Sequence, residues 1–482
     1  MLKKPPRNAI LAIVGKFGQF FWYGFLFMQK LIFLLVCCCI YIGTVLSGCA
    51  AATPGALTGQ NVKNAGPPPI RIAAAEPKAL PDYDIEDRNA KTSAVAAGAN
   101  EFAFKLGSKL AANCHYESFA CSPYSVWLPL AALAGATREK YAGTLLSALG
   151  VEGVDTADIN AITSYMIYEL TRQKYKDNAD EHGNGNQSQM VISNAIFVRN
   201  DLTVKSAFAQ LFMDCYKGNV INADFGSGDA IVAINQWAGE RTGGLISDIV
   251  DGFDPDTVAA IVNAICYKGK WEREFDRGKT TEGVFHSPGN DENAYFMLLE
   301  GDNLPYYEDA KAQAMPLRIN SGGGMFIFLP KSGDAAEFLS GMTYDYYKEI
   351  TRGCTRESGK LLLPRFKIEN DIKDLDVPLT GLGVPLFDAA AAPLTGGLIE
   401  EDLPVWLGAA SQKVFIEADE EGLTAAAVTR ITVAGAALIV PTEPFEMICD
   451  RPFAFVLYDN TRYAGTYDSG GQVLFTGVVN RP

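Results

Sequence analysis

Two hydrophobic periodicities divide the chain, one typical of helices and one typical of strands. From about residue 96, apolar residues first recur every three or four positions, and uncharged runs rich in β-branched and aromatic residues become frequent further along. The helical period predicts helices over 99–111, 125–134, 138–149, 158–171, 204–216 and 229–242. The strand-like runs predict strands over 189–198, 258–268, 325–329, 360–368, 413–420, 453–458 and 473–479. Because helices largely precede strands, the pattern favours an α+β fold with antiparallel or mixed sheets.

The first 49 residues have the organisation of an export signal. An uncharged apolar run from 31 to 45 follows Lys30, and it is short for a membrane-spanning helix but suits the core of a signal peptide. The run leads into Leu46-Ser47-Gly48-Cys49, which resembles the lipobox of bacterial lipoproteins, where the cysteine is acylated and becomes the new N-terminus. The alternative is a membrane anchor helix with a chance Leu-Ser-Gly-Cys sequence. Since the leader is unusually long, Met28 is an alternative start.

We therefore expect residues 1–49 to be a signal peptide, Cys49 to be lipidated, and the exported chain to be held at a lipid membrane. The expected location is the outer membrane, the cell surface or the periplasm, or else the extracellular space. Residues 50–95 contain six prolines and a single aromatic residue, Tyr83. Such a segment buries too little apolar surface to offset its conformational entropy, so we expect a disordered tether. The folded domain is then expected over 96–482.

Composition and charge restrict the partners of this domain. The chain is 48% hydrophobic and 20% charged, which is ordinary for a globular protein. Its formal net charge is −15, and the basic residues of the leader leave the rest more acidic still. A chain this acidic does not bind a phosphate backbone by general electrostatic attraction, so nucleic acid is not an expected partner. Residues 138–140 are too sparsely basic for a polyanion cofactor.

Residues of catalytic or metal-binding type are few and scattered. The six cysteines of the domain have no CxxC spacing, so isolated thiols are expected, with a Cys114–Cys121 bridge as the alternative. The three histidines (His115, His182 and His286) have no nucleophile signature beside them, and G-x-S-x-G, HExxH and P-loop spacings are absent. The run 321–324 (Ser-Gly-Gly-Gly) predicts a hairpin turn. We therefore expect no enzymatic activity, no metal and no cofactor.

The most informative segment lies between Gly422 and Pro441. It has high strand propensity, and Arg430 carries its only charge. With a period of two, one face holds Leu423, Ala425, Ala427, Thr429, Ile431 and Val433, and the other holds Thr424, Ala426, Val428, Arg430, Thr432 and Ala434. One interpretation is an ordinary buried strand. The other is a segment that exists outside a sheet as a loop and later enters a sheet as a strand.

Motifs in register over nearly all of residues 96–482 resemble those of the serpins. The hinge of that family is similar to Glu420, Glu421, Gly422, Leu423, Thr424, Ala425, Ala426, Ala427, Val428 and Thr429. The family's closing signature resembles 445–453 and 473–480. Its central-sheet strand, with a tryptophan at the top, resembles 262–271, and the motif beneath that sheet resembles Ser122-Pro-Tyr-Ser125. Further agreement occurs, in the expected order, at 194–197, 234–237 and 363–368.

The resemblance implies an α+β fold with three β-sheets, eight or nine helices and an exposed reactive-centre loop, in a monomer. It implies that a serine or cysteine protease attacks the loop, forms an acyl-enzyme, and is trapped when the cleaved loop inserts into the central sheet. The family spacing places the cleaved bond between Ala436 and Ala437, with Leu438 and Ile439 as alternatives. Such small or aliphatic residues suit the shallow apolar pocket of elastase-like or subtilisin-like proteases. The alternative is a non-inhibitory serpin that acts as a surface binding or structural protein.

Two positions depart from the pattern of inhibitory members. The residue after the hinge glycine is usually Thr or Ser, and here it is Leu423, which is uncharged and can still be buried. The histidine of the family's central sheet falls on Gln412. The resemblance implies hydrogen bonds from this position to Ser125 and Asn263, which an amide can replace in part. Together with Ser122 and Trp271, these residues form the expected sheet-opening region.

Overall fold

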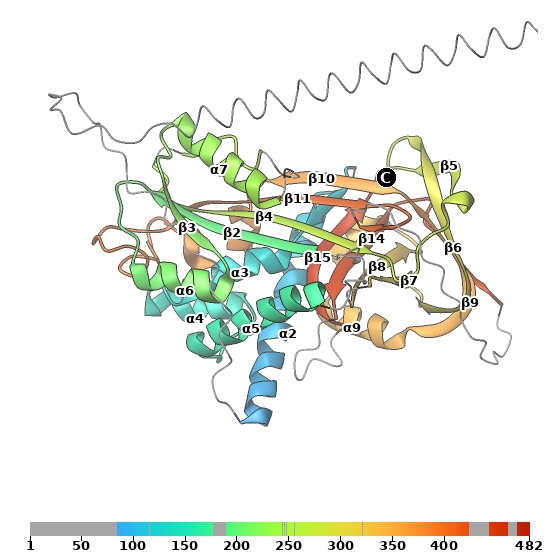
Figure 1. The fold of residues 1–482 in the computed structure, drawn as a ribbon, viewed down its shortest axis with the longest axis horizontal. Coiled ribbons are helices and arrows are strands. Elements are labelled where there is room, and N and C mark those ends of the chain that lie inside the picture. Colours follow the sequence, from blue (N-terminus) through green and yellow to red (C-terminus); the bar gives the residue numbers. More distant parts are fainter. Residues whose placement is uncertain are drawn as a thin grey trace, which may run out of the picture. The chain divides into compact units, whose positions relative to one another are not determined.

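The computed structural model describes residues 84–482 except 115, 177–188, 243, 245, 247, 255, 321, 424–442 and 461–469. All described residues belong to one unit, Gly66–Pro482 (Figure 1). Its nine described α-helices are α2 (Ile85–Ala111), α3 (Pro123–Ala134), α4 (Glu139–Ala148), α5 (Thr156–Lys176), α6 (Ser206–Tyr216), α7 (Gly228–Thr242), α8 (Ala335–Ser340), α9 (Tyr344–Gly353) and α10 (Asp376–Gly381). The expected signal peptide and the lipidation residue Cys49 lie outside the described residues.

The described strands carry the labels β1 to β15. They are β1 (Phe119–Cys121), β2 (Gln189–Arg199), β3 (Asn219–Ala223), β4 (Ala259–Lys270), β5 (Thr281–His286), β6 (Asp291–Glu308), β7 (Ala312–Arg318), β8 (Gly323–Pro330), β9 (Thr355–Pro364), β10 (Phe366–Ile372), β11 (Leu407–Ala418), β12 (Gly422–Leu423), β13 (Phe445–Ile448), β14 (Phe453–Asp459) and β15 (Gln472–Val479).

Helix α2 begins earlier than the sequence predicted. Its first turn carries Glu86 and Asp87 and its last turn carries Lys109, an arrangement that the helix dipole favours. Val95 is fully buried, and Lys91 binds Asp158 of α5 at 2.9 Å. The expected disordered tether is therefore wrong for residues 85–95, which are helical. Residues 85–95 follow the last proline of the segment, Pro81, and contain helix-forming residues. The prediction was wrong for them because it was based on the proline content of the whole segment.

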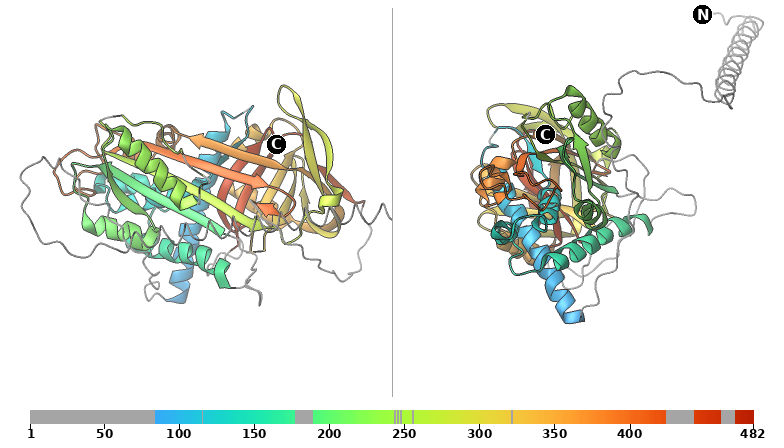
Figure 2. Two further views of the ribbon diagram at one scale, coloured as in Figure 1. Left: turned by 45° about the horizontal axis from the view of Figure 1, so that its top comes forward. Right: turned by 90° about the vertical axis from the view of Figure 1, so that its left-hand side faces the viewer.

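One sheet of six described strands, hereafter the large sheet, has the strand order β10-β11-β12-β4-β2-β3 (Figure 2). Antiparallel pairs join β10 to β11 and β2 to β4, whereas β11 and β4 are parallel, as are β2 and β3. One face packs on α7, where Ile234 and Ala238 contact Phe197 and Val262. The opposite face packs on α3 (Figure 1). This mixed sheet, covered by helices on both faces, agrees with the expected fold class.

The remaining strands form a path of hydrogen-bonded pairs in the order β1-β15-β14-β8-β7-β6-β9-β13, with β5 also paired to β6. The long strand β6 belongs to two sheets. Its earlier residues pair with β5 and β9, and its end, Tyr307 and Glu308, pairs with β7. The three sheets that the sequence led us to expect are therefore present, and two of them meet on β6.

The predicted strand over 360–368 is two strands in different sheets. Strand β9 ends at Pro364, and β10 begins at Phe366 as the edge strand of the large sheet. Pro364 has no N–H group, and the N–H of Arg365 donates to the carbonyl of Tyr295 in β6. The chain therefore changes sheet at Arg365. The apolar residues on either side of Pro364 and Arg365 do not reveal this change, because both strands are buried on one side.

Helix α3 is buried at every one of its 12 residues. Such a helix is hydrophobic all round, and Pro123 occupies its first turn, where no N–H donor is needed. The indole of Trp127 donates to the carbonyl of Leu149 at 3.1 Å, which fixes α3 against α4. The buried start of α3 thus presents Ser122 and Ser125 to the centre of the large sheet.

Two smaller expectations concern a turn and the cysteines. Gly322 lies in the turn between β7 and β8, with a φ of 92° that an L side chain rarely adopts. The described thiols of Cys114 and Cys121 are free, so the alternative bridge between them is not formed. Burial raises the pKa of the Cys121 thiol to about 12, which makes it unreactive.

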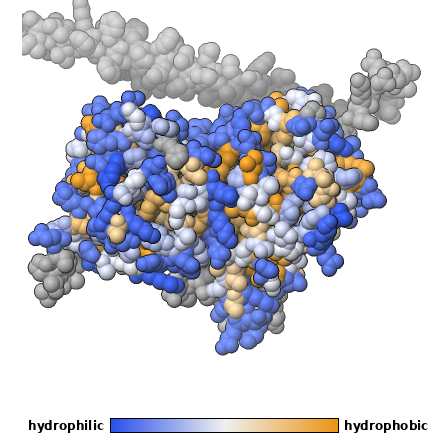
Figure 3. All heavy atoms as spheres, turned by 180° about the vertical axis from the view of Figure 1, so that it is seen from behind, coloured by the Kyte–Doolittle hydropathy of each residue, from blue (hydrophilic) through white to orange (hydrophobic). Residues whose placement is uncertain are grey.

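Hydrophilic residues predominate on the face seen in Figure 3, and hydrophobic residues form small separate areas there. The exposed large hydrophobic side chains of the described chain include Val232, Val284, Tyr295 and Val377, which come from different elements. Scattered apolar residues of this kind are normal on a protein surface.

Candidate functional site

The hinge segment joins the large sheet as the two-residue strand β12. Leu423 lies opposite Ala418 of β11 and opposite Gly269 of β4, and β12 is antiparallel to both neighbours. The Leu423 side chain is 1% exposed and belongs to the main hydrophobic core. A Cβ on Gly422 would lie 2.1 Å from the carbonyl oxygen of Gly269, so only glycine fits between the two strands. The departure from Thr or Ser at position 423 is therefore accommodated by burial in the core.

A tight turn reverses the chain between β11 and β12. The carboxylate of Asp419 accepts hydrogen bonds from the N–H groups of Glu421 and Gly422, at 2.9 and 3.1 Å. The N–H of Asp419 in turn donates to the carbonyl of Gly422 at 3.0 Å. This side-chain-stabilised turn directs the chain back along β11.

Glu420 anchors the turn through a buried carboxylate that is 2% exposed. Arg365 donates to both carboxylate oxygens, and the hydroxyl of Thr280 donates at 2.6 Å. Burial opposes ionisation of Glu420, but these hydrogen bonds outweigh it, so the pKa of the carboxyl lies below its usual value. Because folding lowers this pKa, the carboxylate stabilises the fold above its unfolded pKa, and that contribution is lost as the pH falls through the folded pKa.

Trp271 and Phe275 hold the end of β4 against the same turn. The backbone N–H of Trp271 donates to the carbonyl of Glu421 at 2.9 Å, and its indole N–H donates to the carbonyl of Asp419 at 2.8 Å. The Phe275 N–H donates to the carbonyl of Glu420 at 2.9 Å, and the two aromatic rings meet edge to face. The top of β4, the turn and the hinge therefore form one connected unit.

Below the hinge, Gln412 joins β11, β4 and the start of α3. Its amide nitrogen lies 3.0 Å from both the Ser125 hydroxyl and the Asn263 side-chain oxygen, and 2.9 Å from the carbonyl of Ser122. Its amide oxygen accepts the N–H of Ser122 at 2.8 Å. Asn263 also donates to Asn194 of β2. The structure thus brings together Ser122, Ser125, Asn263 and Gln412 as expected, with Gln412 as both donor and acceptor.

Truncation of Gln412 is expected to lower the free energy of unfolding by about 2–4 kcal/mol, because Gln412→Ala leaves the buried N–H of Ser122 without a partner and creates a cavity. Urea unfolding followed by circular dichroism measures the change. Gln210→Ala is the matched control, since Gln210 is exposed and bonds only across one helical turn to Asp214. Equal stabilities of the two variants would contradict a structural role for this network.

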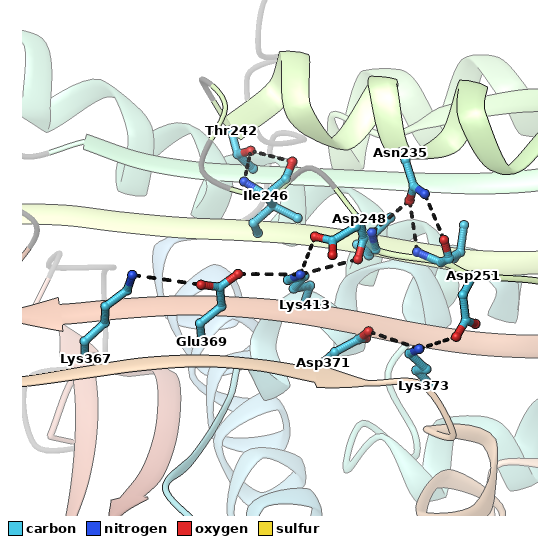
Figure 4. Close-up of polar contacts among 12 residues, drawn as sticks. Asn235, Thr242, Ile246, Asp248, Asp251, Lys367, Glu369, Asp371, Lys373 and Lys413 are labelled. Atoms are coloured by element: carbon cyan, nitrogen blue, oxygen red, sulfur yellow. Dashed lines mark hydrogen bonds and ion pairs between the residues drawn. The ribbon is translucent and has the colours of Figure 1, made fainter. Parts of the chain in front are cut away.

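On the outer face of the large sheet, the segment between α7 and β4 is fastened to β11 (Figure 4). Lys413 of β11 is buried except for 8% of its side chain, and it binds the Asp248 carboxylate at 2.5 Å and Glu369 at 3.6 Å. Lys373 similarly binds Asp251. Asn235 of α7 accepts the N–H of Val250 at 3.0 Å, so the helix holds the same segment. A strand that separates β11 from β4 has to fit beneath this segment.

Several predicted site residues lie outside the described residues. They are the rest of the hinge (Thr424, Ala425, Ala426, Ala427, Val428 and Thr429) and the candidate cleavage positions Ala436, Ala437, Leu438 and Ile439.

Sequence analysis missed the roles of Arg365, Thr280, Asp419, Lys413 and Asp248. Of these five residues, only Arg365 could have been noticed in the sequence, because it is a charged residue inside the 363–368 motif. Among the described residues, no group of three or more His, Cys, Asp or Glu side chains is arranged to hold a metal ion.

Comparisons with known proteins agree with this geometry. The protein-family model described as "Serpin (serine protease inhibitor)" matches residues 97–482. An uncharacterized serpin-like protein of Thermococcus kodakarensis is 29% identical over 404 residues, which cover 83% of this chain and 88% of that protein. Plasminogen activator inhibitor 1 of Mus musculus is 27% identical over 406 residues, which cover 81% and 94% of the two chains.

Solved structures show the same fold. Tengpin, a thermophilic serpin in its native state, superposes with a TM-score of 0.69 at 24% identity, and the match covers 85% of this chain and 98% of that chain. The family match extends over the hinge strand, the turn at Glu420 and the Gln412 network alike. This chain therefore belongs to the serpin family.

Proposed function

We propose that this serpin is an irreversible suicide-substrate inhibitor of serine or cysteine endopeptidases with elastase-like or subtilisin-like specificity. After the protease cleaves the reactive loop, the loop inserts into the large sheet as an additional strand and traps the acyl-enzyme. The observation that carries this proposal is β12, which places the hinge between β11 and β4 in the uncleaved chain. Insertion then only has to extend a strand that has already begun.

The register of β12 supports extension of this strand. Continued beyond Leu423 with a period of two, it puts Ala425, Ala427 and Thr429 opposite Ile416, Val414 and Gln412 of β11, and opposite Tyr267, Ile265 and Asn263 of β4. All six of these partners are buried. The uncharged face of the loop would therefore turn towards the core. Insertion has to separate the parallel pairs of β11 and β4, including the contact between Gln412 and Asn263.

The single charge of the segment does not prevent insertion in this register. Arg430 falls on the outer face, opposite Ser411 of β11 and Val262 of β4. Asp248 lies on that face, where it binds the neighbouring Lys413, and its carboxylate side chain is largely exposed. A carboxylate accepts several donors, so Asp248 has the capacity to bind a second cation. A buried guanidinium with an acidic partner costs far less than an unpaired one.

The specificity follows from the candidate cleavage positions. Ala436 and Ala437, with Leu438 and Ile439 as alternatives, offer only small or aliphatic side chains to a protease pocket. Between Gly422 and Pro441, Arg430 is the one position that a trypsin-like enzyme would select. Cleavage at Arg430 would leave too short an inserted strand to trap the enzyme, so we expect trypsin-like proteases to degrade the loop without being inhibited.

A protease panel tests this function. The chain without its first 49 residues is mixed with elastase-like, subtilisin-like, trypsin-like and papain-like enzymes, and denaturing gels detect covalent complexes. We expect a stable complex with the elastase-like or subtilisin-like enzyme. Mass spectrometry is expected to find a released C-terminal peptide that starts near Ala437. Cleavage without a complex throughout the panel would favour the alternative, a non-inhibitory serpin with a binding or structural role.

We further propose that the protein is exported and anchored to a membrane through an acylated Cys49. The apolar run 31–45 and the Leu-Ser-Gly-Cys sequence after it support this. Within the described residues, no helix has both the length and the apolar character that crossing a membrane requires. Mass spectrometry of protein extracted from membranes is expected to find an acylated N-terminal Cys49. An unmodified N-terminus at Met1 or Met28 would contradict the proposal.

A further inference from the structure

A cavity of about 740 Å³ lies beside the β7–β8 turn. Its walls come from β6, β7, β8, α9, the start of β9, the end of β14 and the Gly470-Gly471 pair before β15. The volume falls in the range of small-molecule sites in proteins. None of the residues that we assign to loop insertion lines it.

Three arginines give this cavity its charge. Arg318 from the end of β7, Arg352 from α9 and Arg356 from β9 all line it, and Glu272 is the one acidic residue among the described lining residues. The cavity wall is therefore basic, although the whole chain has a net charge of −15. Arginines from three separate elements that converge on one space provide several donors in fixed planar arrays, which match carboxylate and phosphate oxygens.

Two groups that line the cavity are influenced by the guanidinium charges. Burial raises the pKa of the Cys354 thiol to about 11, and the positive charges of Arg318 and Arg356 oppose this shift. Burial also raises the pKa of Tyr458, and Arg318 opposes that shift as well. Cys354 and Tyr458 both line the cavity. The charge of Arg318 therefore acts on both Cys354 and Tyr458, and the charge of Arg356 acts on Cys354.

Four described glycines, Gly322, Gly323, Gly470 and Gly471, line the cavity. A Cβ placed on Gly322 would meet no atom within 4 Å, so the missing side chain there leaves open space. At Gly323, Gly470 and Gly471 a Cβ would instead collide with Tyr458, Tyr347 or Asp459, so these three glycines allow close packing of the cavity wall.

We propose that this cavity binds a compact anion with at least two negative charges, of the phosphate, sulfate or polycarboxylate class, through Arg318, Arg352 and Arg356. A compact anion fits a volume of this size, whereas an extended polyanion needs a basic track along the surface. Two or more charges allow one ligand to pair with arginines on different walls. The site is separate from the proposed inhibitory loop, so it can exist whether or not the protein inhibits a protease.

Isothermal titration of the chain without its leader tests the site. The probes are inorganic phosphate, pyrophosphate, sulfate and tricarballylate, at equal ionic strength, with chloride as the monovalent reference. We expect at least one multivalent probe to bind at one site, with an affinity that falls as salt increases. We expect Arg318→Ala to weaken that binding about 10- to 100-fold, because one charged hydrogen-bonding group is lost.

The control is Arg241→Ala, because Arg241 is an exposed arginine of α7 that contacts Asn219 and does not line the cavity. It is expected to bind the probe like the unchanged chain. Arg318→Lys keeps the charge and is expected to bind with intermediate affinity, which separates loss of the donor array from misfolding. Failure of all four probes to bind the unchanged chain would overturn the proposal. Equal affinities of Arg318→Ala and Arg241→Ala would overturn it too.

Discussion

Leu423→Glu is expected to convert the protein from an inhibitor into a substrate of the same protease. Leu423 is 1% exposed and lies in the core between β11 and β4, so a carboxylate there would be buried without a partner. In the uncleaved chain, only the two-residue strand β12 has to leave the sheet to bring this carboxylate to solvent. After cleavage, however, this position has to enter the sheet before any other residue of the loop.

The expected size of this effect follows from the cost of the buried charge. An unpaired carboxylate raises the insertion barrier by several kcal/mol, and ~4 kcal/mol slows insertion roughly 1000-fold. Deacylation then outruns trapping, so the protease releases cleaved serpin. The stoichiometry of inhibition, measured as moles of serpin consumed per mole of protease inactivated, is expected to rise steeply, and the covalent band on denaturing gels is expected to disappear.

Two variants make this test specific. Leu423→Thr introduces the residue that is usual in inhibitory members and is expected to keep the complex. Thr424→Lys places a charge one residue further on, where the continued register turns the side chain to the face of Glu417, an exposed carboxylate of β11. This variant is also expected to form a complex. If Leu423→Glu traps protease as well as the unchanged chain does, insertion between β11 and β4 is not the mechanism.

Strands β2 and β4 of the large sheet could be predicted from sequence because both of their faces are covered. Strands β2 and β4 contain long runs of uncharged residues, and their predicted ranges agree closely with the structure. Strand β6 escaped prediction because exposed Glu300 and Asp302 interrupt its apolar pattern. The start of β9 was not predicted either, because it is mostly polar. Partly exposed strands of this kind are stabilised by pairing with neighbours, which a single sequence does not display.

The candidate site also has a part that could be predicted from the sequence and a part that could not. Gln412, Ser125 and Asn263 were placed together by the family resemblance, and the structure adds that Gln412 accepts the N–H of Ser122 as well as donating. The ion pairs around them could not be predicted. Glu420 and Arg365 are 55 positions apart, and Lys413 and Asp248 are 165 apart. Neither separation corresponds to a local spacing rule, so only the folded chain shows that these charges meet.

Cleavage of the loop is expected to raise the melting temperature of the isolated protein by about 10–20 °C. A trypsin-like enzyme should cut at Arg430 and leave a short inserted strand, whereas a cut near Ala436 should leave a long one. In the long form, the five core-facing side chains after Leu423 contribute ~1 kcal/mol each and the new ladder hydrogen bonds ~1 kcal/mol each, which gives on the order of 10 kcal/mol. For a domain of this size, that free energy corresponds to a shift of about 10–20 °C.

Differential scanning calorimetry of intact, Arg430-cut and Ala436-cut protein checks this expectation, and the three melting temperatures should rise in that order. Insertion contributes in proportion to the length of strand that enters between β11 and β4, so the order tests the mechanism independently of any trapped enzyme. Leu423→Glu cut near Ala436 is the control, and its melting temperature should stay close to that of its uncut form. If the cut and uncut forms of the unchanged chain melt at the same temperature, the loop does not insert, and the hinge strand β12 is a structural feature of a non-inhibitory serpin.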